Sequence, residues 1–352
     1  MKGMFPVLSL LSIALLLGCL GFGGPEGELF LVPDKADAYL VMKPSAILAD
    51  EDVINSMKES GTGDIEAQFQ KARDELGFDL QKINKATVFM KLDGTTGSSM
   101  PYGGAVLYGE FDSNTIAAKL REQGEITEEQ YGGFTIYTRD ARDVYKSIDG
   151  TDEMYSKQPE MSSVAVINSK TAVFGTPETV RDCIDVKNGQ KKALAEAGLE
   201  RVAGAVDKNG MAFFVMRIPD TLKKEAEESE TGIVDTKSFS KMTHLGVSFN
   251  KAGSNMALRV AVLFQTAKDA EKSSDVLQGL VIMAKGMTEE DSASGKIVRD
   301  IKIGADGDML RASLDATKET WDKLQQEVGK QDVIPQTPDY SQGWEENDGV
   351  NN

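Results

Sequence analysis

The chain has 352 residues, and its 39 Lys and Arg stand against 56 Asp and Glu, so its formal net charge at pH 7 is −17. With 40% hydrophobic residues, 34 glycines and 10 prolines, the composition is that of a folded chain and excludes a disordered or fibrous protein. The acidity opposes binding to a phosphate backbone, so no nucleic-acid partner is expected, and two cysteines exclude a disulfide-stapled scaffold.

The amino terminus predicts an export signal. After Lys2 no charged residue occurs before Glu26, and residues 5–17 are almost entirely apolar. A short basic start followed by an apolar run is the plan of a secretory signal peptide. The alternative is a retained membrane helix, because residues 3–25 are uncharged, although prolines and glycines interrupt that stretch.

The apolar run ends in Leu16, Leu17, Gly18 and Cys19. These four residues resemble the lipobox of prokaryotic (bacterial or archaeal) surface lipoproteins, in which an aliphatic, a variable and a small residue precede cysteine. The resemblance is confined to this signal and indicates no characterised family. It implies that residues 1–18 are a signal peptide, that Cys19 is the lipidation site, and that residues 19–30 form a lipidated tether. The chain is then expected on the extracytoplasmic face of the cell membrane, held by a lipid anchor.

Residues 31–190 are predicted to form a first α+β unit. Alternating apolar residues predict strands, and apolar residues three and four apart predict helices. Strands are expected near 37–43, 86–92, 103–111, 133–138, 162–167 and 171–175, and helices near 50–59, 64–76, 113–123 and 177–187. The last helix has the clearest start, because Thr176 can cap its free amides and Pro177 fits the first helical position.

Residues 191–330 are predicted to form a second α+β unit. Strands are expected near 211–217, 244–250, 255–264, 298–304 and 308–314, and helices near 219–228, 267–285 and 316–328. Glycine-containing turns at 251–254 and 305–307 join paired strands. The buried face of the longest helix is expected to contain Ala270, Leu277, Val281 and Ala284.

Three short segments of the first unit recur in the same order in the second. Residues 38–43 match 212–217, residues 86–91 match 245–250, and residues 105–108 match 261–264. The offset falls from 174 to 159 and 156, which places extra length in the first unit, where the helix at 64–76 is expected. The pattern predicts an internal repeat. The expected fold is α+β, with two related units of mostly antiparallel sheet and helices on one face, similar to a ferredoxin-like duplication.

Two further segments carry separate predictions. Residues 331–352 are polar and acidic and contain proline and glycine, so a disordered acidic tail is expected there. Trp344 in this tail is either incidental or the anchor of a short partner-binding motif. Residues 139–161 break the strand pattern, and because long loops are often functional they are the first candidate for a contact surface.

Residues with catalytic or metal-binding chemistry are sparse. The single histidine, His244, is expected to be solvent-facing or hydrogen-bonded at a strand end, and Cys183 to be a small core residue. The acidic groups at 149–153 and 289–291 lack the spacing of an EF-hand loop. Met283 and Met287, one helical turn apart, are expected to fill the core rather than bind copper. No catalytic residue, metal or cofactor is therefore predicted.

The leading hypothesis is a non-enzymatic, lipid-anchored cell-surface protein that presents a binding or interaction surface to a protein or small solute outside the cell. The alternative is a solute-binding component of a membrane transporter, which would require a ligand-sized cleft between the halves. A lesser alternative is a carboxylate-dependent surface hydrolase, which would require two acids in one pocket, one of them with a raised pKa. The sequence leaves the ligand and the oligomeric state open.

Overall fold

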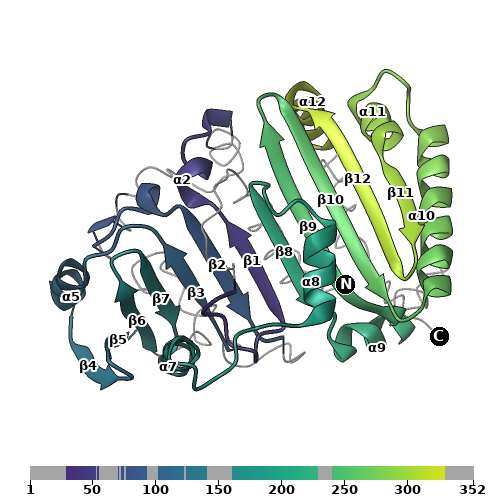
Figure 1. Cartoon of the computed structure of the whole chain (residues 1–352). Helices are drawn as coiled ribbons and strands as arrows, with labels where there is room; N and C mark the ends of the chain where they lie inside the picture. The colour runs from purple at the N-terminus through teal and green to yellow at the C-terminus, as the bar shows by residue number, and fades with distance from the viewer. Residues whose placement is uncertain are drawn as a thin grey trace, which may run out of the picture.

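The computed structural model describes residues 29–52, 54, 70, 73–74, 77–92, 102–122, 124–140, 161–228 and 240–329 (Figure 1). Within these residues, helices pack on one large antiparallel sheet of 12 strands, so the α+β class is confirmed. The strand order is β11-β12-β10-β9-β8-β1-β2-β3-β7-β6-β5-β4. The signal peptide, Cys19, the tail at 331–352 and most of the loop at 139–161 lie outside the described residues.

The described part of the first half supplies one side of this sheet. Its strands are β1 (Ala38–Met42), β2 (Lys85–Met90), β3 (Gly103–Tyr108), β4 (Ile126–Tyr131), β5 (Phe134–Asp140), β6 (Met161–Asn168) and β7 (Thr171–Gly175). Its helices are α2 (Pro44–Ile47), the 3-10 helix η1 (Leu80–Lys82), α5 (Ser113–Glu122) and α7 (Pro177–Lys187). The Thr176 side chain accepts a hydrogen bond from the Thr179 amide, which confirms the predicted cap of α7.

The second half supplies the other side. Its strands are β8 (Ala212–Arg217), β9 (Met242–Ala252), β10 (Asn255–Phe264), β11 (Lys302–Asp306) and β12 (Met309–Thr317). Its helices are α8 (Ala197–Ala205), α9 (Asp220–Glu228), α10 (Ala267–Met287), α11 (Ala293–Asp300) and α12 (Lys318–Gly329). Gly253 and Gly307 adopt φ values of 60° and 58° in the turns β9–β10 and β11–β12, where the sequence predicts hairpins.

The elements β4, α8 and α11 do not follow from the sequence patterns. Strand β4 is mostly polar and half of its residues are exposed, so it lacks the apolar alternation that marks a half-buried strand. The prediction of a strand from 298 is wrong at its start, because α11 runs to Asp300 and β11 begins at Lys302. Ser292 accepts a hydrogen bond from the Gly295 amide and caps α11, and this local capping favours a helix over a strand.

The two halves meet in the middle of the sheet. Strands β1 and β8 pair antiparallel, with Ala38 opposite Met216 and Met42 opposite Ala212. On either side of this junction lie β2 and β3, and β9 and β10, which are the strands that contain the matched sequence segments. All strand pairs in the described sheet are antiparallel. A split βαβ unit contains a parallel pair, so this topology gives the ferredoxin-like expectation no support.

Helices cover both faces of the sheet, so the prediction of helices on one face is wrong. Along β10, Ala261 and Leu263 pack in the core cluster that contains α8 residues, whereas Val262 and Phe264 pack in the cluster that contains Ala270 of α10. Successive residues of a strand point to opposite faces, which places α8 and α10 on opposite sides of the sheet. The reason is the sequence of the central strands, whose consecutive apolar residues require cover on both faces.

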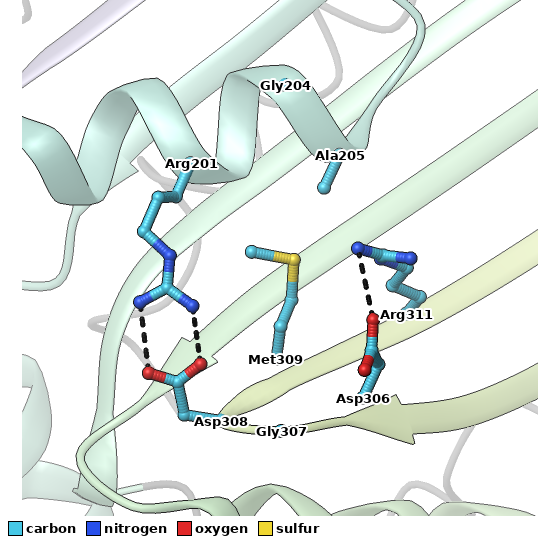
Figure 2. Close-up of a pocket in the computed structure, with 8 residues that line it drawn as sticks. All are labelled: Arg201, Gly204, Ala205, Asp306, Gly307, Asp308, Met309 and Arg311. Atoms are coloured by element: carbon cyan, nitrogen blue, oxygen red, sulfur yellow. Dashed lines mark hydrogen bonds and ion pairs between the residues drawn. The ribbon is translucent and has the colours of Figure 1, made fainter.

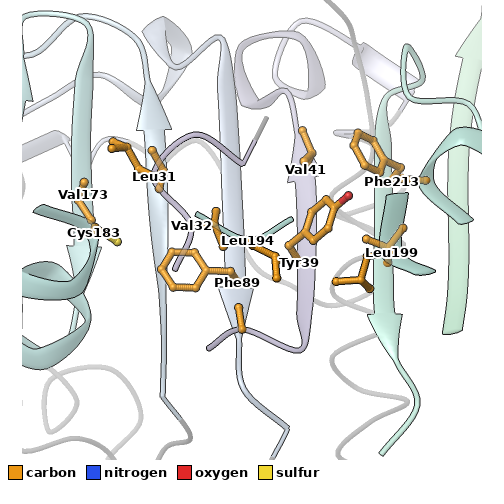
Figure 3. Packing of buried hydrophobic residues seen from close by; sticks show 14 of the residues in the cluster. Leu31, Val32, Tyr39, Val41, Phe89, Val173, Cys183, Leu194, Leu199 and Phe213 are labelled. Atoms are coloured by element: carbon orange, nitrogen blue, oxygen red, sulfur yellow. The ribbon is translucent and has the colours of Figure 1, made fainter. Parts of the chain in front are cut away.

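The largest core cluster spans both halves on the face covered by α7 and α8 (Figure 3). Tyr39 of β1 and Phe213 of β8 meet edge to face across the junction, with ring centroids 6.0 Å apart. Leu31 and Val32, which precede β1, are fully buried in the same cluster. The core therefore ties the start of the described chain and both halves into one body.

Candidate functional site

His244 and Cys183 both lie in structural positions. His244 of β9 is only 9% exposed, and its Nε2 lies 2.7 Å from Glu196 Oε1 while Nδ1 lies 3.0 Å from Thr243 Oγ1. The hydrogen-bonded form of the prediction is thus confirmed and the solvent-facing form is wrong. Cys183 is fully buried in α7, and this burial raises the pKa of its thiol, as expected for a core cysteine.

The prediction that Met283 and Met287 fill the core is wrong. Their exposed fractions are 51% and 80%. The buried side of α10 is formed by Ala270 and, next to the core, by Leu277. In a helix with 3.6 residues per turn, positions 283 and 287 point away from that side. These methionines are therefore part of a surface, not of the core.

The acidic segment 289–291 is exposed between α10 and α11. Among the described residues, no three His, Cys, Asp or Glu side chains are grouped closely enough to hold a metal ion. The other acidic segment, 149–153, and the candidate contact loop lie outside the described residues, as does Trp344.

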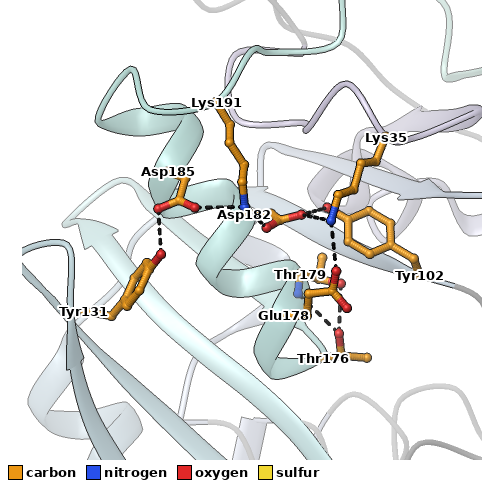
Figure 4. A network of polar contacts seen from close by, with 9 residues as sticks. All are labelled: Lys35, Tyr102, Tyr131, Thr176, Glu178, Thr179, Asp182, Asp185 and Lys191. Atoms are coloured by element: carbon orange, nitrogen blue, oxygen red, sulfur yellow. Dashed lines mark hydrogen bonds and ion pairs between the residues drawn. The ribbon is translucent and has the colours of Figure 1, made fainter.

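A charged network surrounds α7 (Figure 4). The Asp182 carboxylate, whose side chain is 3% exposed, accepts a hydrogen bond of 2.9 Å from the Tyr102 hydroxyl, lies 3.0 Å from Lys35 Nζ and pairs with Lys191. Lys191 also lies 2.9 Å from Asp185, which accepts a hydrogen bond of 2.8 Å from the Tyr131 hydroxyl.

This network joins the segment before β1, the start of β3, the β4–β5 hairpin and α7. Both oxygens of Asp182 are engaged by partners, which is the arrangement a buried carboxylate needs to remain charged. We therefore assign the network to stabilising the fold rather than to chemistry.

The candidate functional site is an uncovered part of the sheet in the second half. Helix α8 packs on β8, β9 and β10, and Met309 at the start of β12 is buried in the same core cluster. Beyond Met309, β12 and β11 are open on that face. Along β12, Leu310 and Leu314 face the helices on the other side, whereas Arg311, Ser313 and Asp315 alternate with them and face away. This open strip, which we call the polar groove, is lined by Arg201, Gly204, Ala205, Arg259, Val260, Lys302, Ile303, Gly304, Asp306, Gly307, Asp308, Met309, Arg311, Ala312 and Ser313.

Two adjoining cavities of about 400 Å³ each make up the groove. In the strand register, Ser313 of β12 lies between Arg259 of β10 and Lys302 of β11. Arg311 lies two residues away on the same face. The groove therefore presents a hydroxyl between two cations, with a third cation beside them, in a chain that is otherwise strongly acidic.

Acids at the margin of the groove pair with its arginines (Figure 2). Arg201 of α8 forms a two-pronged ion pair with Asp308, with distances of 3.0 and 2.5 Å, and the guanidinium holds the pKa of Asp308 below its ordinary value. Arg311 lies 3.7 Å from the exposed Asp306, a looser contact. Within the described residues, Lys302 has no ion pair. Arg259 lies 2.6 Å from Asp315, so Arg311 and Lys302 are the cations most available to a partner.

The same groove bears on the hydrolase hypothesis. Asp306 and Asp308 line one cavity, but the pKa of Asp308 is lowered by Arg201, whereas a general acid requires a raised pKa. Asp308 therefore does not provide the acid that such a mechanism needs.

A third cavity, of about 330 Å³, lies at the junction of the halves. Asp37 and Leu92 line it from the first half, and Arg217 and residues 218–221 and 223 line it from the second. Arg217 Nη2 lies 2.5 Å from Asp37 Oδ1 across the junction. The cavity is near the lower limit of volumes that hold small ligands.

In the described part of the chain, no helix is both long and apolar enough to span a membrane.

Comparison with known proteins assigns no family. No family model matches the sequence, and no curated protein matches it. Crystal forms I, III and IV of the protein TP0453 are similar in structure, each with a TM-score of 0.46. Sequence identity is 8%, 8% and 9%, and the alignments cover 87%, 87% and 84% of this chain and 99%, 98% and 95% of TP0453. A likeness at this level assigns neither family nor function.

Proposed function

We propose that this chain is a non-enzymatic, lipid-anchored cell-surface protein, and that the polar groove is the surface with which it binds a protein partner. The uncovered face of β12 and β11 carries the proposal. Most of the other described sheet is covered by helices, whereas here charged and small side chains face solvent. Exposed polar residues on a rigid sheet are suited to recognition.

Two features favour a protein over a small solute as the partner. The groove combines Arg201, Arg311 and Lys302 with Asp306 and Asp308, so it offers charges of both signs across a broad strip. In the described sheet, β11 has a strand on one side only, and an extended segment of a partner can pair with such an edge.

A photo-crosslinker placed at Ser313 in the full chain, in intact cells, tests the groove. We expect one dominant protein adduct, because position 313 lies in the middle of the groove. Charge reversal by Arg311→Glu together with Lys302→Glu should reduce that adduct at least ten-fold, since rim charges steer association. The Lys170→Glu substitution, in the exposed turn between β6 and β7, is the matched control and should leave it unchanged. Equal labelling in the reversed and control variants would contradict the proposal.

Substitution of Cys19 tests the lipid anchor. Cys19→Ser should release the protein from membranes or block its processing, because the thiol of residue 19 is the proposed lipid acceptor. The intact mass of the protein extracted from membranes provides the measurement: a chain that begins at Cys19 with a lipid-sized addition is expected. Two lipid chains are needed for durable anchoring, because one acyl chain binds membranes weakly. A full-length, unmodified chain would instead favour the retained membrane helix.

The proposal includes an origin by duplication. With the offset of 174, Leu40 corresponds to Phe214, and these two residues lie directly opposite each other in the β1–β8 pair. Equivalent residues face each other when a two-fold axis passes through an antiparallel pair. Outward from that axis, the order β1-β2-β3-β7-β6 parallels β8-β9-β10-β12-β11, and the hairpin β4–β5 is an addition to the first half. This symmetry favours two related units.

The second candidate function is a solute-binding component of a transporter, and the cavity at the junction favours it. The Asp37–Arg217 pair offers both charges to a small zwitterionic solute. A library of amino acids and other small polar solutes that produced no shift in the melting temperature of the full chain would remove this candidate.

A further inference from the structure

We propose that the middle of the polar groove is an oxyanion subsite, which holds one carboxylate of an extended partner segment. This deepens the proposed function, on which it rests, by naming the chemistry of the partner. The cavity there is lined by three cations and one hydroxyl, those of Arg259, Lys302, Arg311 and Ser313, and none of the described residues that line it is acidic. The chain as a whole has a formal net charge of −17, so three cations around one cavity are a local exception.

Strand pairing fixes the arrangement of these side chains. Ser313 of β12 lies directly opposite Arg259 of β10 on one side and Lys302 of β11 on the other, so the three residues form one row on the same face of the sheet. Neighbouring strands lie about 4.8 Å apart, which separates the outer two backbones by about 10 Å. Arg311 is two residues from Ser313 on the same face, in the next row. A carboxylate above Ser313 is therefore within reach of cations from three strands.

Three of the four groups are available to a ligand. Within the described residues, the Ser313 hydroxyl has no hydrogen bond and the Lys302 ammonium has no ion pair. Arg311 Nη2 lies 3.7 Å from Asp306, whose side chain is 78% exposed, so this pair is loose and weak (Figure 2). These three donors can turn to a carboxylate without breaking a strong contact, and hydrogen bonds to a charged acceptor are the stronger kind.

Arg259 forms one wall of the subsite. Its guanidinium donates hydrogen bonds of 3.0 and 3.1 Å to the carbonyl oxygens of Leu258 and Leu314, and one of 2.6 Å to Asp315. These bonds hold the guanidinium beside the row, but they use most of its five N–H donors. Asp315 also balances its charge. The attraction for an anion therefore comes mainly from Lys302 and Arg311.

The remaining acids of this region do not fill the subsite. Asp308 is held by Arg201 in the two-pronged pair. Asp300 is the last residue of α11, and α11 packs on the opposite face of β12. When each ion pair of the groove is counted as neutral, the charge of Lys302 is left over. The groove is thus suited to one anionic group and not to a polyanion.

The space around the subsite favours a carboxylate on a segment over a free anion such as phosphate. The cavity measures about 400 Å³, much more than a single anion fills, and a second cavity of that size adjoins it. Gly204 and Gly304 line this space, and a Cβ added at either would meet no atom within 4 Å. Phosphate sites commonly use free backbone amides, whereas β12 is paired on both sides here. An extended segment along β12 fits both observations.

Peptide binding to the full chain in nonionic detergent tests the subsite. The probe is a seven-residue peptide of threonine and valine with glutamate at its centre and with blocked ends, and the matched peptide has glutamine there. At about 10 mM, ten times an expected dissociation constant on the order of 1 mM, the glutamate peptide should raise the melting temperature by about 2 °C. The glutamine peptide should raise it by less than about 0.5 °C, because it lacks the charge.

Two variants connect this shift to the groove. Lys302→Gln and, separately, Arg311→Gln should reduce the shift caused by the glutamate peptide to that of the glutamine peptide. Both residues are exposed or partly exposed, so the melting temperature without peptide should stay unchanged. Lys170→Gln, at a 70% exposed lysine in the turn between β6 and β7, is the matched control and should keep the full shift.

Three results would overturn the inference. Equal shifts with the two peptides would show that no carboxylate is recognised, and a shift that survives in both groove variants would place the binding elsewhere. Sodium phosphate that matched the glutamate peptide at equal concentration and ionic strength would show a site for free anions. The photo-crosslinking at Ser313 in cells depends on none of these results, so failure here is separable from failure of the proposed function.

Discussion

Phe213→Ala should lower the free energy of unfolding by about 3–5 kcal/mol, as truncation of a fully buried phenylalanine does. Phe213 is 2% exposed, lies in the central strand β8 and packs edge to face on Tyr39 of β1. The truncation opens a cavity at the junction where β1 of the first half pairs with β8 of the second. Because the core cluster continues on both sides of this junction, it has little freedom to collapse into the space. Urea unfolding of the full chain measures the loss.

The adjacent residue provides the matched control. Phe214 has the same side chain and belongs to the same strand, but it points to the other face and is only partly buried. Phe214→Ala should cost about 1–2 kcal/mol, because less apolar surface returns to water. Equal losses in the two variants would contradict a junction held mainly by the cluster around Tyr39 and Phe213.

Much of the sheet could be predicted from the sequence because its central strands are locally unambiguous. The segments of β1, β8 and β10 are short apolar runs bounded by turn residues, and the hairpin glycines at 253 and 307 mark two connections. The start of helix α7 is also locally unambiguous, since a capping threonine and a proline define it. In these places, local preference and tertiary structure agree.

Other features depend on contacts that local patterns do not contain. The face on which a helix lies is set by packing between distant elements, so α8 and α10 could not be assigned to opposite faces from periodicity alone. The candidate site was missed for a related reason: Arg201 lies on a helix that was not predicted, and Arg259 and Lys302 meet only through the strand register. The sequence did contain one signal of the candidate site. Arg311, Ser313, Asp315 and Thr317 alternate with apolar residues, which is typical of a strand with one face in solvent.

Asp182→Asn should lower the free energy of unfolding at pH 7 by about 2 kcal/mol, the order expected when a buried charged hydrogen-bond acceptor loses its charge. Asparagine keeps the shape of the side chain, but its amide cannot accept hydrogen bonds from Lys35, Lys191 and Tyr102 together. The loss is smaller than for a fully buried ion pair, because Lys35 and Lys191 are 44% and 39% exposed and regain water. Glu178→Gln is the control. Glu178 is 66% exposed and contacts the same Lys35, so this substitution should lower the free energy of unfolding by no more than about 0.5 kcal/mol.

The pH dependence of the stability difference between wild type and Asp182→Asn identifies the cause of that difference. Burial by itself raises the pKa of Asp182, but the hydrogen bonds from Lys191, Lys35 and Tyr102 outweigh it and hold the pKa below its ordinary value. A carboxyl whose pKa is lower in the folded state stabilises the fold above its unfolded pKa, which is about 3.9, and loses that effect as the pH falls through the folded pKa. The difference between wild type and Asp182→Asn should therefore be constant from pH 7 to about 5 and shrink below about pH 4. A difference that persisted unchanged at pH 3 would show that the asparagine side chain disturbs packing, and that the charge of Asp182 does not hold the network together.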